Sequence, residues 1–349
     1  MERLKKAAIV GGTGYGALEL IRLLHTHSEI ELVKIISHSQ NDTEISTIYP
    51  HLKSIEDIAL EILDIPTLIQ DVDILLFATP AGVAKEIIPS LVGSGVQCVD
   101  LSGDLRLSSQ EQYKAWYKSE AAEQDLLDTA VYGLSEINRK QIRDATILSN
   151  PGCFPTAALL GLIPAIKQEH VHTDGIIIDG KTGVSGAGKT PSGRTHFPET
   201  NGNITPYKIG GHQHIPEIDQ YLSEQGNETV YATFTTHLVP MTRGILCTMY
   251  GRLSGQQSTE EILSDYKHFY EKDRFVRILD EGELPTTKSV YGSNFCDIAL
   301  HVDNRTNQLI IISAIDNLMK GAAGQAIQNV NIMNGWDEEN GLNQIPIYP

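Results

Sequence analysis

The sequence predicts an α/β domain built on a doubly wound parallel sheet, joined to an α+β domain with a mixed or antiparallel sheet. Two patterns support this fold class. Short apolar runs alternate with segments of helical spacing up to about residue 149, whereas residues 175–314 are rich in strand-like runs. A chain of 349 residues is also too long for one ordinary core. We expect domains at 1–149 and 150–315, with a C-terminal helical segment, 316–349, returning to complete the first.

The chain opens on an apolar run, residues 6–10, which we expect to be a buried parallel strand. Seven residues follow that read Gly11-Gly12-Thr13-Gly14-Tyr15-Gly16-Ala17, and then a segment of helical spacing at 18–24. Strand, glycine turn and helix in this order favour a dinucleotide-binding turn of the Rossmann type, because glycines let the backbone approach a pyrophosphate at the helix N-terminus. The alternative is a tight turn without a ligand.

The second strand, 31–37, ends in Ser37-His38-Ser39. NAD-specific folds tend to place an acidic residue at this position, against the ribose 2′-hydroxyl. Hydroxyl groups without a carboxylate favour the 2′-phosphate of NADP instead. The alternative is a polar strand end with no cofactor role.

Three further segments of the first domain are informative. A buried strand within 71–80 runs into the loop Thr79-Pro80-Ala81-Gly82, which would lie at the carboxyl edge of the sheet, where the cofactor binds. A helix is expected at 84–91 and a strand at 96–101. The turn after that strand carries Arg106, which is either an anion clamp or part of a surface salt bridge. Residues 108–128 are polar and helical.

Residues 149–156 read Ser-Asn-Pro-Gly-Cys-Phe-Pro-Thr, between a strand-like run at 145–148 and an apolar helix beginning near 157. Pro151-Gly152 is a turn pair, and Pro155 suits the first turn of a helix. Cys153 would therefore lie at the positive end of a helix, a setting that lowers a thiol pKa and makes a nucleophile. The alternative is a small buried cysteine.

The second domain is predicted from strands at 175–180, 229–236, 246–251, 298–302 and 309–314. Its glycine-rich stretch Gly183–Thr190 matches the phosphate-binding pattern G-x4-G-K-[ST], which raises the alternative of an ATP-dependent phosphotransferase. Two prolines and a glycine follow Thr190, so the helix that such a loop requires is not expected. A cofactor or substrate loop is the better interpretation. A final helix is predicted at 317–333.

Two histidines, His212 and His214, precede a helix that begins near Pro216. Either could be the acid–base partner of Cys153. No cysteine or acidic cluster completes a metal site with them, and we expect no bound metal. Arg243 lies in a later turn and is a second candidate for holding an anion.

Composition excludes several classes. The formal net charge is −17, from 27 basic and 44 acidic residues, which argues against nucleic-acid binding. No run reaches the about 18 apolar residues of a membrane span. The N-terminus lacks the pattern of a signal peptide, so we expect a cytoplasmic protein. Its four scattered cysteines are expected to be reduced.

Taken together, these motifs resemble the N-acetyl-γ-glutamyl-phosphate reductase family of arginine biosynthesis. The matching stretches are 11–20, 100–107, 132–139, 149–156, 181–188, 210–218, 237–245 and 316–331. The sequence departs from the family pattern at His38, Ala81, Gly103 and Leu105, and Phe154 replaces a commoner tyrosine. The resemblance implies a Rossmann domain, an α+β catalytic domain, NADPH as donor, a small acyl phosphate substrate and a homodimer or homotetramer.

The resemblance also implies roles for individual residues. Cys153 would attack the acyl phosphate and form a thioester, which NADPH reduces to the semialdehyde. The resemblance places the acid–base histidine within 211–216, where we favour His212 over His214. Arg106, Asn150 and Arg243 would bind substrate. The cofactor contacts would come from Gly11, Thr13, Gly14, Tyr15, Gly16, Ser37, Ser39, Thr79, Pro80, Ser185, Gly186 and Asn317.

Three other functions are considered. The nearest is the reduction of a different acyl phosphate, either aspartyl phosphate or an aminoadipyl phosphate on a carrier protein, although the acidic composition disfavours an acidic carrier. The second is the phosphotransferase based on Gly183–Thr190. The third is a nucleotide-binding sensor without turnover.

Overall fold

The computed structural model describes residues 3–38, 40–226 and 228–349, so Ser39 lies outside the described residues. The chain divides into two compact units, each of which is described by itself. Unit 1 comprises residues 1–151 and 322–343, and unit 2 comprises residues 152–321 and 344–349. Residues 316–321 and 344–349, which the sequence analysis assigned to the first domain, thus belong to unit 2.

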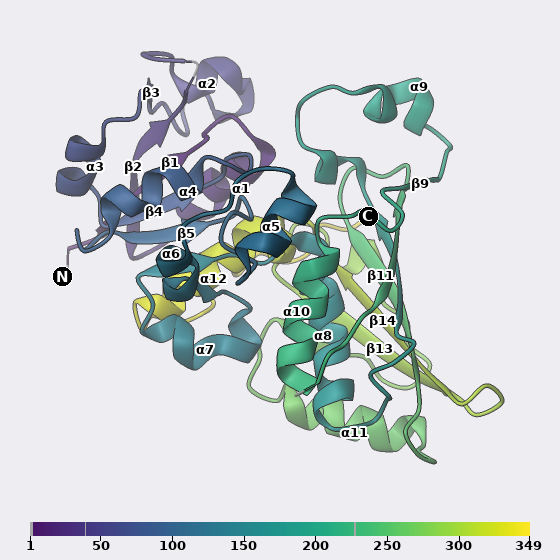
Figure 1. The fold of residues 1–349 in the computed structure, drawn as a ribbon. Coiled ribbons are helices and arrows are strands. Elements are labelled where there is room, and N and C mark those ends of the chain that lie inside the picture. The colour runs from purple at the N-terminus through teal and green to yellow at the C-terminus, as the bar shows by residue number, and fades with distance from the viewer. Residues whose placement is uncertain (1–2, 39, 227) are drawn as a thin grey trace. The chain divides into compact units, whose positions relative to one another are not determined.

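Unit 1 is built on a seven-stranded sheet with the strand order β3-β2-β1-β4-β5-β7-β6 (Figure 1). Every neighbouring pair in it is parallel. This confirms the predicted doubly wound sheet. Its elements are β1 (Lys5–Val10), α1 (Tyr15–Leu24), β2 (Ile30–Ile36), α2 (Ile45–Ile48), β3 (Leu60–Glu61), α3 (Ile65–Asp71), β4 (Ile74–Phe77), α4 (Ala84–Ile87), β5 (Gln97–Asp100), α5 (Gln110–Tyr117), α6 (Gln124–Thr129), β6 (Val131–Tyr132), α7 (Ser135–Arg143), β7 (Ile147–Ser149) and α12 (Gly324–Met333).

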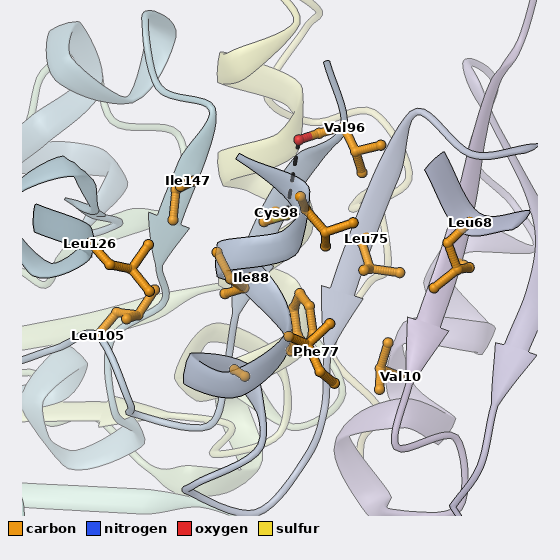
Figure 2. Close-up of a cluster of buried hydrophobic side chains, with 14 of the residues drawn as sticks. Val10, Leu68, Leu75, Phe77, Ile88, Val96, Cys98, Leu105, Leu126 and Ile147 are labelled. Carbon is orange, nitrogen blue, oxygen red and sulfur yellow. Dashed lines mark hydrogen bonds between the residues drawn. The ribbon is translucent and has the colours of Figure 1, made fainter. Parts of the chain in front are cut away.

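The core of unit 1 consists of aliphatic and aromatic side chains from its central strands and the helices beside them (Figure 2). Leu75 and Phe77 of β4 are completely buried there, as is Ile88, and Cys98 of β5 is almost so. Burial on both faces explains why these strands read as continuous apolar runs. The predicted helix at 84–91 is shorter than expected, because the chain tightens into a 3₁₀ turn over Ile88–Leu91 at Pro89.

Helix α12 belongs to unit 1 although the sequence of unit 2 precedes it. Buried polar side chains attach it to the α7 region. Gln325 and Asn329 each donate to the Gly133 carbonyl, at 2.9 and 2.7 Å, and Ser135 Oγ donates to Asn329 Oδ1 at 2.6 Å. These buried hydrogen bonds between side chains and backbone favour one docked position for the helix.

Unit 2 contains a second seven-stranded sheet, with the order β12-β13-β14-β11-β8-β10-β9. It is mixed, since β8–β10 and β12–β13 are parallel and the other pairs are antiparallel. The predicted α+β domain is confirmed. Its elements are α8 (Cys153–Lys167), β8 (Ile177–Thr182), α9 (Phe197–Thr200), β9 (Thr205–Tyr207), α10 (Ile215–Gly226), β10 (Thr233–Leu238), β11 (Ile245–Arg252), α11 (Thr259–Phe269), β12 (Val276–Ile278), β13 (Cys296–Asp303) and β14 (Gln308–Ile315). A π-helical turn, Met319–Ala323, follows, of which residues 319–321 belong to unit 2.

Helix α8 is the buried centre of unit 2, and it contains an internal proline, Pro164. Pro164 has no N–H to donate to the Leu160 carbonyl, four residues earlier. Tyr270 Oη donates to that carbonyl at 2.6 Å instead. The helix therefore continues without a buried unpaired acceptor.

Two segments of unit 2 bear on the sequence interpretation. Between Gly183 and His196, all of which the structure describes, there are only two 3₁₀ turns, Val184–Ala187 and Gly193–Thr195. The phosphate-binding helix of the phosphotransferase alternative is absent there. The predicted final helix, 317–333, instead begins as the π-helical turn Met319–Ala323 and becomes α-helical only at Gly324.

Candidate active site

Cys153 is the first residue of α8, as the sequence predicted. Gly152 is the N-cap residue and contributes no side-chain cap, and Cys153 itself is partly exposed. The positive end of the helix dipole favours the negatively charged thiolate at this position. The other three cysteines, Cys98, Cys247 and Cys296, are buried.

The thiols of Cys98 and Cys247 are in a different electrostatic setting. Burial raises the pKa of Cys98 to about 12, with a further contribution from Asp100. Burial also raises the pKa of Cys247. These two thiols therefore stay protonated at neutral pH, and Cys153 at the helix terminus is the candidate nucleophile.

Glu217 holds the turn before Cys153, and sequence reasoning missed it. It is completely buried on α10, and its Oε1 accepts a hydrogen bond from the Gly152 N–H at 2.8 Å. A carboxylate that accepts a backbone N–H fixes the cysteine turn against α10. Its position three residues after His214, on the same helix face, was the available signal in the sequence.

His214 packs directly on the cysteine turn. A Cβ placed on Gly152 would lie 2.5 Å from His214 Nε2, so no larger residue fits there without moving the imidazole. Glycine at this position thus brings the imidazole edge against the residue that precedes the nucleophile. His214 is itself mostly buried.

His212 has a different environment, although its ring centroid lies only 4.7 Å from that of His214. Its Nδ1 accepts the His214 N–H at 3.1 Å, so a neutral ring carries its proton on Nε2. Phe154, Tyr207 and Phe234 surround it edge-on, with centroids at 5.5–5.8 Å. Burial, together with a smaller contribution from the nearby Lys208 ammonium, lowers the pKa of His212 to about 3. His212 is therefore a neutral, fixed ring.

The depressed pKa of His212 predicts a loss of stability in acid. Below its ordinary value of 6.5, the unfolded state binds a proton that the folded state refuses until about pH 3. Lowering the pH through this window therefore favours unfolding, by about 1.4 kcal/mol for each pH unit. Between pH 7 and pH 5, the wild type should lose about 2 kcal/mol more unfolding free energy than His212→Gln, measured by urea denaturation. Equal losses in the two proteins would show that His212 titrates normally.

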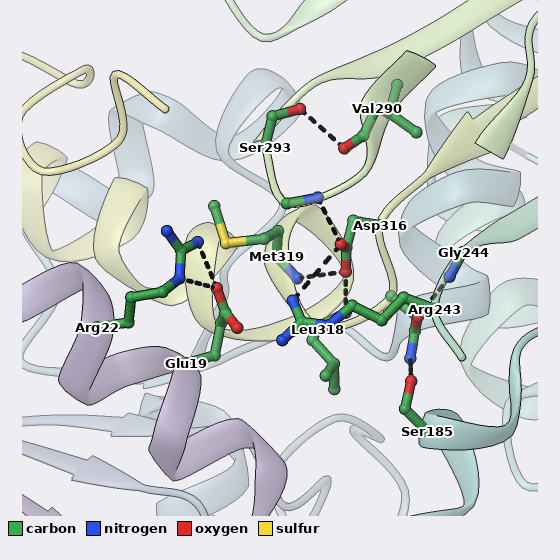
Figure 3. A network of polar contacts seen from close by, with 12 residues as sticks. Glu19, Arg22, Ser185, Arg243, Gly244, Val290, Ser293, Asp316, Leu318 and Met319 are labelled. Atoms are coloured by element: carbon green, nitrogen blue, oxygen red, sulfur yellow. Dashed lines mark hydrogen bonds and ion pairs between the residues drawn. The ribbon is translucent and has the colours of Figure 1, made fainter. Parts of the chain in front are cut away.

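A second polar cluster in unit 2 centres on Asp316, directly after β14 (Figure 3). Its neighbour Asn317 accepts the Gly244 N–H at 2.8 Å and donates to Ser185 Oγ at 3.0 Å. Arg243 Nη1 lies 3.6 Å from Asp316 Oδ2. The structure thus brings together Ser185, Arg243 and Asn317, three residues that the sequence analysis selected far apart in the chain.

The predicted dinucleotide turn of unit 1 has the shape that its ligand needs. Gly11 has a φ of +86°, and a Cβ there would lie 2.6 Å from the Ala78 carbonyl oxygen, so the turn passes close to the end of β4. Helix α1 follows at once, with Gly14 as an N-cap that carries no side-chain hydrogen bond. This leaves the helix terminus open to an anion.

Thr79, in the loop after β4, is the neighbouring candidate for the cofactor. Its Oγ1 is buried and has no hydrogen-bond partner within the described residues. A buried hydroxyl without a partner is costly unless a ligand or water completes it. The turn after β1 and the loop after β4 therefore fit a bound dinucleotide. Ser37 directly follows β2 and is buried, with its N–H bonded to the Glu61 carbonyl.

Arg106 and Asn150 also meet in unit 1. Arg106 Nε donates to the Asn150 carbonyl and its Nη2 to the Leu101 carbonyl, each at 2.9 Å. The Asn150 side chain is completely buried, and it bonds the Ala322 carbonyl and Asn329. Asn150 thus anchors Arg106 three residues before Cys153 in the chain.

This fold, with a cysteine at the start of a buried helix, is that of a two-domain oxidoreductase of the semialdehyde dehydrogenase type. Residues 6–145 match the family model "Semialdehyde dehydrogenase, NAD binding domain", and residues 153–317 match "Semialdehyde dehydrogenase, dimerisation domain". Among solved structures, aspartate semialdehyde dehydrogenase II from Vibrio cholerae has a TM-score of 0.72 at 15% identity, covering 96% of this chain and 99% of that one. Aspartate semialdehyde dehydrogenase from Francisella tularensis has a TM-score of 0.70 at 16% identity, covering 95% and 100%.

The curated relatives are more specific. The N-acetyl-gamma-glutamyl-phosphate reductase of Oceanobacillus iheyensis is 58% identical over 99% of this chain and 100% of its own length. The enzyme of that name from Bacillus subtilis is 49% identical over 99% of this chain and 100% of its own length. The chain belongs to the N-acetyl-gamma-glutamyl-phosphate reductase family.

Within the residues that the structure describes, no helix combines the length and apolar character needed to cross a membrane.

Proposed function

We propose that this protein reduces N-acetyl-L-glutamyl 5-phosphate to N-acetyl-L-glutamate 5-semialdehyde with NADPH and releases phosphate, a step of arginine biosynthesis. The observation that carries the proposal is the placement of Cys153 at the start of α8, directly after Gly152, which contacts His214 and Glu217. The names of the curated relatives supply the substrate.

The chemistry follows from a thiolate, which is both a strong nucleophile and a fair leaving group. The Cys153 sulfur attacks the acyl carbon and forms a C–S bond, and the C–O bond to phosphate breaks. When bound, the nicotinamide would supply a hydride to the acyl carbon of this thioester. The C–S bond of the resulting tetrahedral oxyanion would then break, releasing the aldehyde and restoring the Cys153 thiolate. Covalent catalysis divides one difficult reduction into two easier steps.

We propose His214 as the acid–base residue, in place of the His212 that the sequence favoured. The support is geometric, because the Nε2 edge of His214 lies on the turn that presents Cys153. His212 has its Nδ1 occupied by the His214 N–H, and its pKa is lowered to about 3. We propose that His212 instead fixes the position of His214.

Two arginines are proposed to bind the anionic groups of the substrate. Arg106 would hold the phosphate, since its guanidinium is buried and fixed by two backbone carbonyls. Arg243, which is partly exposed, would hold the substrate carboxylate. An unchanged KM for phosphate in Arg106→Ala would remove Arg106 from this role.

A preference for NADP over NAD is proposed from the end of β2. Ser37 follows the strand directly, and the sequence there, Ser37-His38-Ser39, contains no carboxylate to repel a 2′-phosphate. Gly11, Thr13, Gly14, Tyr15 and Gly16 would hold the pyrophosphate at α1, with Thr79 and Pro80 opposite. From unit 2, Ser185, Gly186 and Asn317 are proposed as further contacts. Comparable kcat/KM values for the two cofactors would contradict this preference.

The test is the reverse reaction, in which NADP reduction is followed with N-acetyl-glutamate semialdehyde, with and without phosphate. Phosphate-dependent formation of NADPH is the expected result. A parallel assay with aspartate semialdehyde tests the alternative acyl phosphate, and a higher kcat/KM with that aldehyde would overturn the proposed substrate. No signal with either aldehyde, in a protein that binds NADP, would reject the reductase function.

We also propose that the chain forms a homodimer through the open face of the unit 2 sheet. Alternate residues of β11 and β14 point away from the buried side, and Tyr250 pairs with Ile310 across the two strands. Ile177, opposite Tyr250 on β8, is 44% exposed. Partly exposed apolar side chains grouped on one face of a sheet in this way are typical of an interface.

The dimer proposal predicts the mass of the assembly in solution. Wild-type protein should sediment at twice or four times the chain mass of 38.3 kDa. Ile310→Asp should shift the protein toward monomer, because a carboxylate would be desolvated at the interface. The matched substitution Ile62→Asp, at an exposed residue of unit 1, should leave the assembly unchanged. A monomeric wild type would reject the proposal.

A further inference from the structure

Asp316 is a buried carboxylate that accepts hydrogen bonds from two segments of unit 2 and forms an ion pair with a third (Figure 3). Its Oδ1 accepts the Leu318 and Met319 N–H groups at 2.8 and 3.2 Å, which is the pattern of a helix N-cap. Its Oδ2 accepts the Gly292 N–H at 2.8 Å and lies 3.6 Å from Arg243 Nη1. Each oxygen therefore has its own partners.

The Oδ1 side leads to the nucleophile. The backbone carbonyl of Asp316 accepts the Gly321 N–H at 3.0 Å, the i→i+5 hydrogen bond of the π-helical turn. A Cβ on Gly321 would lie 2.7 Å from Cys153 Cβ, so the turn passes directly against the cysteine. Single π-helical turns at or within α-helices often occur at functional sites. Here the turn forms one wall around Cys153.

The Oδ2 side leads to the substrate-binding arginine. Arg243 precedes Gly244, whose N–H is held by Asn317, the next residue after Asp316. The Arg243 guanidinium also lies 5.9 Å from the centroid of the Tyr291 ring, beside Gly292. The carboxylate thus fixes both the backbone turn that contains Gly292 and the direction of Arg243.

We propose that Asp316 is a positioning residue that sets the nucleophile and the substrate-binding arginine at the same time, Cys153 through its Oδ1 side and Arg243 through its Oδ2 side. We call the link from Asp316 to Cys153 the Cys153 arm and the link from Asp316 to Arg243 the Arg243 arm. Only the Arg243 arm rests on the proposed function. It predicts that the two arms can be separated by substitution, since the two oxygens serve different partners.

Unit 2 contains a second buried carboxylate that serves as a matched control for the substitution of Asp316. Asp297 on β13 is 2% exposed and pairs with Arg277 at 2.6 and 2.9 Å. Like Asp316, Asp297 is buried and pairs with an arginine, but that arginine, Arg277, lies on β12. Substitution of Asp297 should therefore cost folding stability without touching Cys153 or Arg243.

The experiment compares Asp316→Asn and Asp316→Ala with Asp297→Asn and Asp297→Ala. Asparagine can still accept hydrogen bonds from the Leu318 and Met319 N–H groups with its side-chain oxygen. Its amide NH2 group would then face Gly292 and Arg243, which are also donors, so neither contact could form. In Asp316→Asn, the KM for the semialdehyde should rise about tenfold, while alkylation of Cys153 by iodoacetamide at pH 7 stays within about twofold. In Asp316→Ala, alkylation should also slow by about tenfold. Both Asp297 variants should match wild type in both readouts while losing thermal stability.

The outcomes test the Cys153 arm and the Arg243 arm separately. Asp297 variants that reproduce the Asp316 changes would show general loosening and overturn the proposal, as would Asp316→Asn with an unchanged KM. If Asp316→Ala does not fold, Asp316→Gly removes the same carboxylate at a smaller cost to the helix start. Alkylation of Cys153 should slow by about tenfold in this variant too, and unaltered alkylation would overturn the Cys153 arm. Because alkylation needs neither substrate nor cofactor, it stays informative even if the wild type shows no phosphate-dependent NADP reduction, the result that would reject the proposed function instead.

Discussion

Replacing Cys153 with serine should reduce phosphate-dependent turnover by at least about a thousandfold, because a hydroxyl at this position is neither ionised nor a good leaving group. The shape of the turn should survive, since serine is nearly isosteric and suits a helix start. NADPH binding, followed by its fluorescence, should therefore be unchanged. The substitution separates the covalent step from cofactor binding.

The control for this prediction is Cys98→Ser. Cys98 is buried in the core of unit 1, and its pKa is raised to about 12, so its thiol has no chemical role. Cys98→Ser should lose some stability but keep its kcat once folded. Mild iodoacetamide should label Cys153 selectively in the wild type. A Cys153→Ser enzyme with near-normal rate would refute the covalent mechanism.

Replacing His214 with glutamine should lower kcat by about a hundredfold to a thousandfold, the usual range for loss of a general acid–base residue. Glutamine cannot take up or release a proton near neutral pH, so it cannot replace the imidazole in proton transfer. The affinity for NADPH should stay the same, because the substitution lies outside the dinucleotide turn.

His212→Gln is the matched comparison. Its amide oxygen can still accept the His214 N–H, and a neutral ring with a pKa near 3 contributes no titration to activity. We expect kcat to fall by no more than about tenfold and the pH–rate profile to keep its shape. If His212→Gln loses more activity than His214→Gln, the two roles are exchanged and the preference drawn from the sequence stands.

Much of the fold could be predicted because its signals are local. The apolar run, glycine turn and helix at the start of the chain correspond to β1, the Gly11 turn and α1. The turn pair and proline around Cys153 predicted a helix start there, and α8 begins at that residue. The prolines after Thr190 correctly argued against a phosphate-binding helix.

What the sequence did not reveal depends on contacts between distant segments. Glu217 acquires its role only when α10 packs beside the turn at Gly152, 65 residues away in the chain. The π-helical turn at 319–323 could not be distinguished from an α-helix by periodicity, because its register comes from the Gly321 N–H and a tertiary approach to Cys153. The choice between the histidines depended on a backbone hydrogen bond and on burial, neither of which a sequence pattern contains.

The most direct test of the central claim is a single-turnover experiment in the reverse direction, without phosphate. Enzyme mixed with N-acetyl-glutamate semialdehyde and NADP should release a burst of NADPH stoichiometric with Cys153, then stop until phosphate is added. The thioester should be found by mass spectrometry on the peptide that contains Cys153. A reaction with no burst and no acylated Cys153, but with full turnover once phosphate is present, would contradict the covalent account.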